Sequence, residues 1–443
     1  MTLELFTTYG RGGKDFHQVV SFVSDPGEED SVVNLYPEAA YETLEGFGGA
    51  ITESAAYVYS QMDGKQKQRL LETFFSPERM NYQFVRLHLD SCDFSLEQYE
   101  AMSDPGDTSM DSFSLERMEQ YVLPMLRDAQ KAAGRPLELM LSPWSPPAFM
   151  KTNGRREGGG KLKGEYRHFW AEYLCRYILE LKNRGFHIRR MTLQNEPKAA
   201  QPWDSCVFTA KEQRDFLVEC MVPAMAAHGL EDIEIFLWDH NKERAYEWMR
   251  DAVDPVSDPM IAGVAFHWYS GDHFEVLDLI RRQFPGKKLI SSESCIEFFK
   301  FDSQDAVKAA QRLAHELIGD LNHGMTAFYD WNLLLDERGG PNYVENFCLA
   351  PFLYNTKTGK LIPQLLQQYF EKFSHHLLPG SVRIGHSRYT EEIEVTAWKR
   401  PDGALAVILL NQTDRPMPVC LRLNGQLAQC LLQPQSITTG IIS

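Results

Sequence analysis

Residues 166–197 read YRHFWAEYLCRYILELKNRGFHIRRMTLQNEP, and this stretch contains the unit from which the fold is predicted. Its first half, from Tyr166 to Lys182, has apolar side chains at the spacing of an amphipathic helix. The run Arg190–Gln194 is short and apolar, which is typical of a buried strand. Polar Asn195-Glu196-Pro197 follows at once. Alternating helices and strands of this kind indicate parallel βαβ units.

The same rhythm extends in both directions from this stretch. Seven further apolar runs are found at Glu45–Ile51, Phe84–Leu89, Leu137–Leu141, Ile233–Trp238, Ile261–His267, Lys288–Ser292 and Met325–Tyr329. Amphipathic stretches lie between them, including Leu115–Ala132, Ala210–Ala227 and Ala306–Leu321. Together with Arg190–Gln194 these make eight strands alternating with helices, which predicts an α/β protein with a closed (β/α)8 barrel, a TIM barrel.

The two ends of the chain have a different pattern. Short β-type runs occur at Val19–Val23 and Val32–Leu35, and again after Ser381. Between the runs Ile393–Lys399 and Ala404–Asn411, Pro-Asp-Gly provides the positive φ that a tight hairpin turn requires. We therefore predict a β-sandwich attached to the barrel and formed from both chain termini, with residues 1–41 and 374–443 in the sandwich and residues 42–373 in the barrel.

Composition excludes several classes of partner. The formal net charge is −16, and the densest basic stretch, Lys151–Arg167, is interrupted by glycines and glutamates, so we predict no binding to nucleic acid. No apolar run approaches the ~18–20 residues of a membrane span, and no secretory signal is visible near residue 1. The eight cysteines are scattered without a metal-ligand spacing, which favours free thiols, a cytoplasmic location, and no metal or cofactor. The oligomeric state stays open.

Polar or aromatic clusters follow nearly every predicted strand, at the end of the barrel where active sites form. Glu196 closes the fourth run and Glu293 the seventh, so both carboxylates are expected at one barrel mouth. Glycoside hydrolysis needs such a pair, and carboxyl groups about 5–5.5 Å apart give retention of configuration. As acid, Glu196 should have a raised pKa while Glu293 stays ionised. Asp90 and Asp93 are a weaker rival pair because they share one loop.

Several motifs together resemble glycoside hydrolase family 30, which includes glucosylceramidases, β-glucosidases, β-1,6-glucanases and β-xylosidases. They are Gly46-Phe-Gly-Gly-Ala-Ile-Thr-Glu53, Ser142-Pro-Trp-Ser-Pro-Pro-Ala-Phe-Met-Lys-Thr-Asn153, Asn195-Glu196-Pro197, His267-Trp268-Tyr269, Ser292-Glu293, Asp330-Trp331-Asn332 and Gly339-Gly-Pro-Asn-Tyr-Val-Glu-Asn346. The resemblance covers Gly46 to Asn346 and agrees with the predicted barrel and sandwich.

The resemblance also implies roles for individual residues. Glu196 would be the general acid/base and Glu293 the nucleophile, and Asn195 would bind the sugar 2-hydroxyl. The remaining substrate-binding positions implied by the family motifs are Glu53, Trp144, His267, Tyr269, Trp331 and Asn346. Of these, Glu53 and Trp144 would bind the outer hydroxyls, while His267 and Tyr269 would lie in or behind the pocket without carrying a proton.

These observations predict a retaining exo-β-glycosidase that hydrolyses β-glucosides or short oligosaccharides with two glutamates. A β-1,6-glucanase or β-xylosidase with the same two residues is the alternative within this class. A barrel that binds carbohydrate without hydrolysing it is an alternative of another class, and a metal-dependent hydrolase is disfavoured by the ligand spacing.

Overall fold

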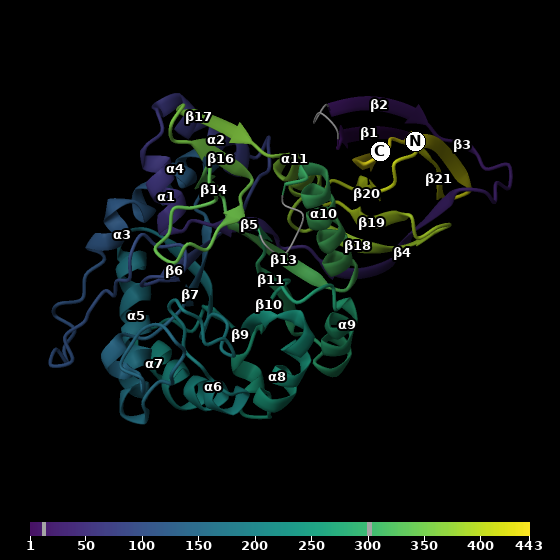
Figure 1. The fold of residues 1–443 in the computed structure, drawn as a ribbon. Helices are drawn as coiled ribbons and strands as arrows, with labels where there is room; N and C mark the ends of the chain where they lie inside the picture. Colours follow the sequence, from purple (N-terminus) through teal and green to yellow (C-terminus); the bar gives the residue numbers. More distant parts are fainter. Residues whose placement is uncertain (11–14, 299–303) are drawn as a thin grey trace.

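The centre of the molecule is a barrel of eight parallel strands (Figure 1). The computed structural model describes residues 1–10, 15–298 and 304–443. In the closed order β10-β11-β13-β5-β6-β7-β8-β9, the first strand of the barrel pairs with the last. The strands are β5 (Gly46–Ala50), β6 (Phe84–Leu89), β7 (Glu138–Pro143), β8 (His187–Thr192), β9 (Glu234–Asn241), β10 (Gly263–His267), β11 (Lys288–Glu293) and β13 (Met325–Asn332). Each overlaps a predicted apolar run, so the predicted barrel is confirmed, although β8 begins three residues before the run predicted at Arg190–Gln194.

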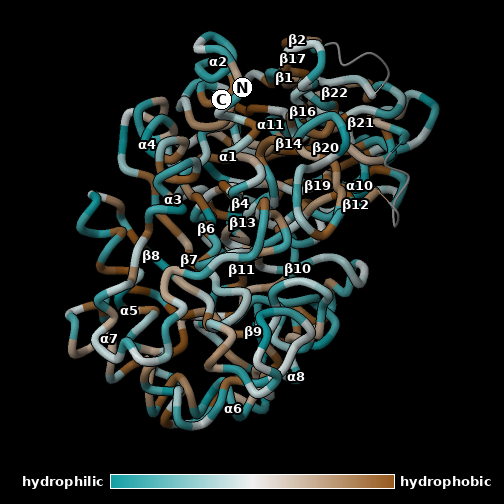
Figure 2. The backbone as a smooth tube through the Cα atoms, turned by 60° about the vertical axis from the view of Figure 1, so that its left-hand side comes forward, coloured by the Kyte–Doolittle hydropathy of each residue, from teal (hydrophilic) through white to brown (hydrophobic). Residues whose placement is uncertain are grey.

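Helices surround the barrel on its outside (Figure 1). They are α1 (Glu53–Ser60), α2 (Gly64–Phe75), α3 (Glu116–Gln120), α4 (Val122–Ala133), α5 (Arg167–Asn183), α6 (Ala210–Phe216), α7 (Val222–Ala227), α8 (Ala245–Ala252), α9 (Phe274–Gln283), α10 (Ala306–Asn322) and α11 (Leu365–Ser374). Hydrophilic and hydrophobic stretches alternate along the outer helices in Figure 2, as expected where one face covers the strands. Along the described residues, no helix has both the length and the apolar character needed to cross a membrane.

Two of the predicted helices are interrupted. The stretch expected at Leu115–Ala132 divides at Tyr121 into α3 and α4, and the stretch expected at Ala210–Ala227 contains a π-helical segment, Leu217–Met221. Each interruption lies just before a proline, Pro124 or Pro223. Proline has no N–H to donate and its ring crowds the carbonyl four residues earlier, so a regular helix cannot continue through it.

Packed side chains fill the interior of the barrel. Phe84, Phe236 and Tyr329 belong to a buried cluster there, and the Arg190 guanidinium lies 4.9 Å from the ring centre of Phe84. Arg190 is fully buried, and it also makes an ion pair of 2.7 Å with Glu45. The barrel is therefore a closed core, which leaves the loops after the strands to form a site.

The attached β-sandwich is built from both ends of the chain, as predicted. Ten strands are hydrogen-bonded in the order β2-β1-β23-β20-β19-β18-β4-β21-β22-β3. They are β1 (Thr2–Tyr9), β2 (Asp15–Ser21), β3 (Val23–Ser24), β4 (Val32–Thr43), β18 (Val382–Arg388), β19 (Ile393–Lys399), β20 (Leu405–Asn411), β21 (Met417–Leu423), β22 (Gln426–Leu432) and β23 (Ser436–Ile442). Its inner faces form a separate core that includes Leu5, Val407 and Leu421. The predicted hairpin joins β19 to β20, with Gly403 at φ 89°.

The chain crosses between sandwich and barrel twice, and the two crossings are bonded together. β4 leads into β5 through only Leu44 and Glu45. The Leu44 N–H donates to the Ser381 carbonyl at 2.8 Å, and the Gly380 N–H donates to the Leu44 carbonyl at 2.8 Å. The residues that lead into the first barrel strand are thus held to those that lead into β18.

Candidate active site

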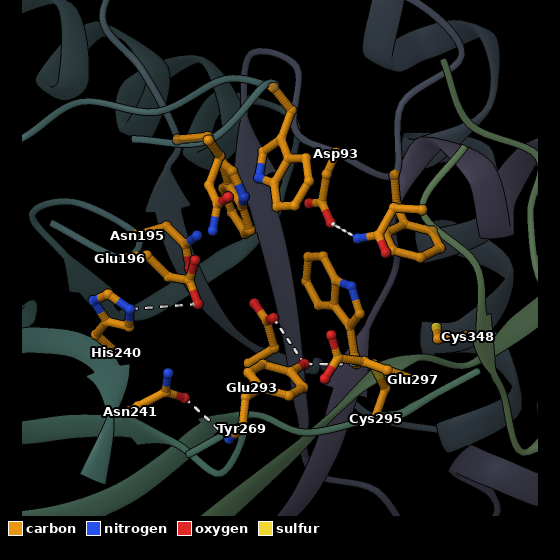
Figure 3. A pocket seen from close by; sticks show the side chains of 16 residues that line it. Asp93, Asn195, Glu196, His240, Asn241, Tyr269, Glu293, Cys295, Glu297 and Cys348 are labelled. Atoms are coloured by element: carbon orange, nitrogen blue, oxygen red, sulfur yellow. Dashed lines mark hydrogen bonds and ion pairs between the residues drawn. The ribbon is translucent and has the colours of Figure 1, made fainter. Parts of the chain in front are cut away.

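A cavity of about 280 Å³ opens where the barrel strands end (Figure 3). Its walls come from loops after β6, β7, β8 and β10 and from the last residues of β9, β11 and β13. It is lined by Asp93, Phe94, Trp144, Asn195, Glu196, Gln201, Trp203, His240, Asn241, Tyr269, Glu293, Cys295, Glu297, Trp331, Asn346 and Cys348. Seven of the nine residues predicted for the site are in this set, and Glu53 and His267 are not.

The two predicted catalytic carboxylates share this cavity. Figure 3 shows the side chains of Glu196 and Glu293 turned toward the same space. Glu293 is the last residue of β11, and Glu196 follows β8 in a left-handed conformation with φ 46°. A non-glycine residue with positive φ is uncommon and marks a locally constrained backbone. The predicted meeting of two distant glutamates is therefore realised in the structure.

A buried arginine and a tyrosine hold the Glu293 carboxylate. Arg86 on β6 donates from Nη1 to Glu293 Oε2 at 2.6 Å, and the Tyr269 hydroxyl donates to Glu293 Oε1 at 3.0 Å. Arg86 also donates to Asn195 Oδ1 and to Asp239 Oδ2, both at 2.9 Å. Burial raises the pKa of Glu293, while the positive charges of His267 and Arg86 oppose that shift. Both carboxylate oxygens thus have donors that favour the charged form.

Glu196 has two histidines beside it. His267 Nδ1 lies 3.3 Å from Glu196 Oε1, and His240 Nε2 lies 3.9 Å from the same oxygen. Burial alone would raise the pKa of Glu196, but the His267 hydrogen bond and the charges of both histidines lower it to about 2. The prediction of a raised pKa for Glu196 is therefore wrong for the resting site, because the sequence did not show that two imidazoles face this carboxylate.

Two tryptophans and a polar pair also line the cavity. The rings of Trp144 and Trp331 stack with centres 5.4 Å apart, and the Arg86 guanidinium lies over both. Asn346 Nδ2 donates to Asp93 Oδ2 at 3.0 Å. Flat aromatic faces beside directional hydrogen-bonding groups are suited to a ring that carries several hydroxyls.

Glu53 is not among the residues that line the cavity. It is the first residue of α1 and is 1% exposed. Its Oε1 accepts from Arg117 Nε at 2.5 Å and its Oε2 accepts from the Leu96 N–H at 2.9 Å. Both oxygens accept from groups outside the cavity, so the structure does not place Glu53 among the lining residues, and its contact with a sugar stays a prediction. Asp93 supplies the carboxylate in the cavity, and its place just after β6 is the signal that could have identified it.

His267 is also behind the cavity wall rather than in it. The side chain is fully buried, with Nδ1 bonded to Glu196 and Nε2 at 3.0 Å from Asp239 Oδ1. Both ring nitrogens have partners behind the wall, so His267 takes the second of the two places expected for it, behind the pocket. Tyr269 does line the cavity, as predicted.

Other lining residues were not predicted. Gln201 and Trp203 lie in the loop before α6, close after the Asn-Glu-Pro motif, and Asn241 ends β9 and accepts from the Tyr269 N–H at 3.0 Å. Cys295 and Cys348 come from the segments around β12 (Ile296–Glu297) and β15 (Cys348–Leu349), which pair with each other. Trp203 could have been noticed as an aromatic residue after a strand end, whereas nothing in the sequence indicated the two cysteines. Among the residues described, no three His, Cys, Asp or Glu side chains are grouped so as to hold a metal.

Comparison with known proteins identifies the family. Residues 44–377 match the glycosyl hydrolase family 30 TIM-barrel domain, and residues 380–440 match the glycosyl hydrolase family 30 beta sandwich domain. The chain belongs to glycosyl hydrolase family 30. It is therefore a glycoside hydrolase with the barrel and sandwich of that family, which confirms the resemblance inferred from the motifs.

Individual relatives of this family 30 enzyme act on different glycosides. The mouse lysosomal acid glucosylceramidase is 30% identical over 408 residues, covering 88% of this chain and 79% of the mouse protein. The endo-1,6-beta-D-glucanase neg1 of Aspergillus fumigatus is 24% identical and covers 96% of this chain and 90% of its own length. Among solved structures, SrfJ from Salmonella typhimurium superimposes with a TM-score of 0.96 at 32% identity, covering 100% of this chain and 99% of SrfJ. The endo-beta1,6-glucanase BT3312 has a TM-score of 0.90 at 25% identity with full coverage of both chains.

Proposed function

We propose that this enzyme is a retaining exo-β-glycosidase that removes a terminal β-glucosyl unit from small glycosides. The observation that carries the proposal is the single cavity that contains both Glu196 and Glu293. Its volume of about 280 Å³ is just below the ~300–1,000 Å³ of typical ligand pockets, which favours one sugar unit over an extended chain. The similarity to a glucosylceramidase supports glucose as that unit.

In the proposed reaction, Glu293 attacks the anomeric carbon while Glu196 passes a proton to the leaving oxygen. A covalent glycosyl ester of Glu293 forms, and water assisted by Glu196 then releases the sugar with its original configuration. Tyr269 and Arg86 keep the two carboxylate oxygens of Glu293 oriented before the attack. The stacked faces of Trp144 and Trp331 and the Asp93–Asn346 pair hold the sugar ring in place.

A second candidate is an endo-acting β-1,6-glucanase. The full-length similarity to the endo-beta1,6-glucanase BT3312 and the A. fumigatus relative favour it. Gln201 and Trp203 at the cavity wall would then contact a further sugar unit. A β-xylosidase with the same two glutamates is tested in the same experiment.

The deciding experiment is a hydrolysis panel of aryl β-glucoside, aryl β-xyloside and β-1,6-linked gluco-oligosaccharides, with the product anomer followed by NMR. Release of β-glucose from the aryl glucoside and from oligosaccharide ends supports the proposal. Initial formation of the α-anomer refutes retention, and internal cleavage of long β-1,6-glucan without attack on the aryl glucoside favours the second candidate. Glu293→Gln should abolish turnover, and Glu196→Ala should accumulate the glycosyl ester with an activated substrate.

A cytoplasmic location is part of the proposal. All eight cysteines are free in the structure, and unpaired thiols suit a reducing compartment. Activity recovered with the membrane or exported fraction of the source cells, rather than the cytoplasmic fraction, would contradict it.

A further inference from the structure

His267 bridges two carboxylates at the base of the cavity. It is the last residue of β10 and is fully buried. Its Nε2 lies 3.0 Å from Asp239 Oδ1, and its Nδ1 lies 3.3 Å from Glu196 Oε1. One imidazole ring therefore connects the predicted acid/base to a second acidic residue that does not line the cavity.

Asp239 is fixed as a charged acceptor. Ser292 donates to its Oδ1 at 2.6 Å, Thr192 donates to its Oδ2 at 2.6 Å, and Arg86 donates to Oδ2 at 2.9 Å. Although burial disfavours the charge, Arg86 and the His267 hydrogen bond hold the pKa of Asp239 below its usual range. Because this carboxylate only accepts, the facing His267 Nε2 must carry a hydrogen, and a change of protonation takes place at Nδ1.

The backbone that presents Asp239 is strained. Trp238 and Asp239, near the end of β9, have φ of 75° and 58°, a left-handed conformation that is unfavourable for a non-glycine residue. The Asp239 carbonyl accepts from the Glu196 N–H at 2.9 Å, so the strained segment also fixes the backbone of the acid/base. Strain kept at a buried polar site suggests that the arrangement of Asp239, His267 and Glu196 serves the reaction.

The charged and titratable groups that face this histidine come from several elements: Arg86 on β6, Asp239 and His240 on β9, Glu196 after β8, Tyr269 after β10 and Glu293 on β11. Burial disfavours the imidazolium, but the charge of Glu293 and the hydrogen bonds to Asp239 and Glu196 raise the pKa of His267 to about 9. The raised pKa of His267 and the lowered pKa of Glu196 both favour the histidine as the holder, at neutral pH, of the single proton between Nδ1 and Oε1.

We infer that His267 stores the proton that Glu196 delivers to the leaving oxygen. The inference rests on the proposed function and deepens it. Glu196 is ionised in the resting site, yet it must deliver a proton to the leaving group. Both statements hold if the acid is the hydrogen-bonded pair of His267 and Glu196 and not the Glu196 carboxyl alone. His267 is a positioning residue here, since it acts through Glu196 and does not touch the substrate.

The proton moves from His267 Nδ1 to Glu196 Oε1 and on to the leaving oxygen as the bond from that oxygen to the anomeric carbon breaks. The electron pair of that bond stays with the leaving group, and a Glu293 oxygen forms the new bond to the anomeric carbon. Neutral His267, ionised Glu196 and a Glu293 ester remain. Since the ester has lost the negative charge that raised the pKa of His267, the pair is then ready to accept a proton from water.

The test uses His267→Gln, which retains hydrogen-bonding capacity but cannot hold the proton. The readout is kcat/KM on two β-glucosides, one with a phenol leaving group that needs an acid and one with 2,4-dinitrophenol that does not. General-acid assistance contributes about 10²–10⁴-fold. We expect a loss of ~10²-fold or more on the phenyl glucoside and less than about tenfold on the dinitrophenyl glucoside. Equal losses on both substrates, or none on either, would overturn the inference.

Two further measurements separate the possible failures. If the wild-type enzyme hydrolyses neither substrate, the proposed function fails, whereas normal wild-type hydrolysis with equal losses in His267→Gln refutes only the inference. Histidine ¹⁵N NMR of the wild-type enzyme does not depend on folding of the variant. One buried histidine should be an imidazolium at pH 7 and become neutral when a 2-fluoroglucoside traps the Glu293 ester. A site without such a histidine in the free enzyme would overturn the inference.

Discussion

Removal of the Arg86 guanidinium is expected to change both the stability of the protein and the pH dependence of its activity. Arg86 is fully buried and donates to Ser142, Asn195, Asp239 and Glu293. In Arg86→Met the aliphatic stem is preserved, but two buried carboxylates lose a cationic partner. Breaking a buried ion pair from one side typically costs about 3–5 kcal/mol, because the remaining charge has no compensation.

The expected effects concern both stability and pH dependence. At roughly 2 °C per kcal/mol for a large domain, the loss corresponds to a Tm about 6–10 °C lower. Hydrogen bonds to charged groups contribute about 1.5–3 kcal/mol, or roughly 1–2 pH units of pKa. Glu293 should therefore be protonated at higher pH, and the acidic limb of kcat/KM for dinitrophenyl β-glucoside should move upward by that amount.

A matched control distinguishes the effect of losing a buried ion pair from the effect of losing any arginine. Arg79 pairs with Glu371 through a similar bond of 2.8 Å, but its side chain is 52% exposed. Exposed pairs contribute about 0–1 kcal/mol, so Arg79→Met should change Tm by no more than roughly 2 °C. The reasoning is refuted if both variants lose the same Tm, or if the acidic limb of Arg86→Met coincides with that of the wild type.

Three other predictions test single contacts. Asp93→Asn should reduce kcat/KM by at least about tenfold, because Asp93 lines the cavity. Glu53→Gln should lower Tm and have a smaller effect on KM, because Glu53 pairs with Arg117 outside the cavity. The reverse pattern would identify Glu53 as the sugar ligand. Tyr269→Phe removes one donor to Glu293 and should lower kcat by about 10–100-fold with a largely unchanged Tm, and an unchanged kcat contradicts the contact. His315 lies between the carboxylates of Asp272 and Glu394, and the hydrogen bond to Glu394 raises its pKa to about 9. The stabilisation of the fold by protonated His315 is therefore complete below about pH 6.5 and is lost as the pH rises through about 9. The Tm difference between wild type and His315→Gln should shrink from pH 6 to pH 9.5, and a constant difference would show that the charge of His315 is irrelevant.

The sequence was sufficient for the barrel because its signals are local. Buried parallel strands require continuous apolar runs, and all eight runs could be located. The interruptions near Pro124 and Pro223 were missed, although the residues were visible, because apolar periodicity continues across them. The β-type character of both ends was equally visible, but the pairing of β1 with β23 depends on contacts more than 400 residues apart.

For the site, position along the chain was predictable and side-chain direction was not. Residues that end a strand reach the barrel mouth, which identified Glu196, Glu293 and Trp331. Glu53 follows a strand as well, but it begins helix α1 and pairs with Arg117 of α3. The lowering of the Glu196 pKa, opposite to the predicted direction, likewise depends on the imidazole of His267. This residue is 71 positions away in the sequence, and only the assembled barrel brings it near.

The hydrogen bonds between the two crossings, at Leu44 and Ser381, bear on how enzymes of this family can be recombined. A chimaera that takes only the C-terminal half of its sandwich from another parent would mismatch the sheet and the junction together, since β4 pairs with both β18 and β21. The exchangeable module is therefore discontinuous: the N-terminal strands through Leu44 travel with everything after Gly380, and the barrel alone is inherited from the second parent.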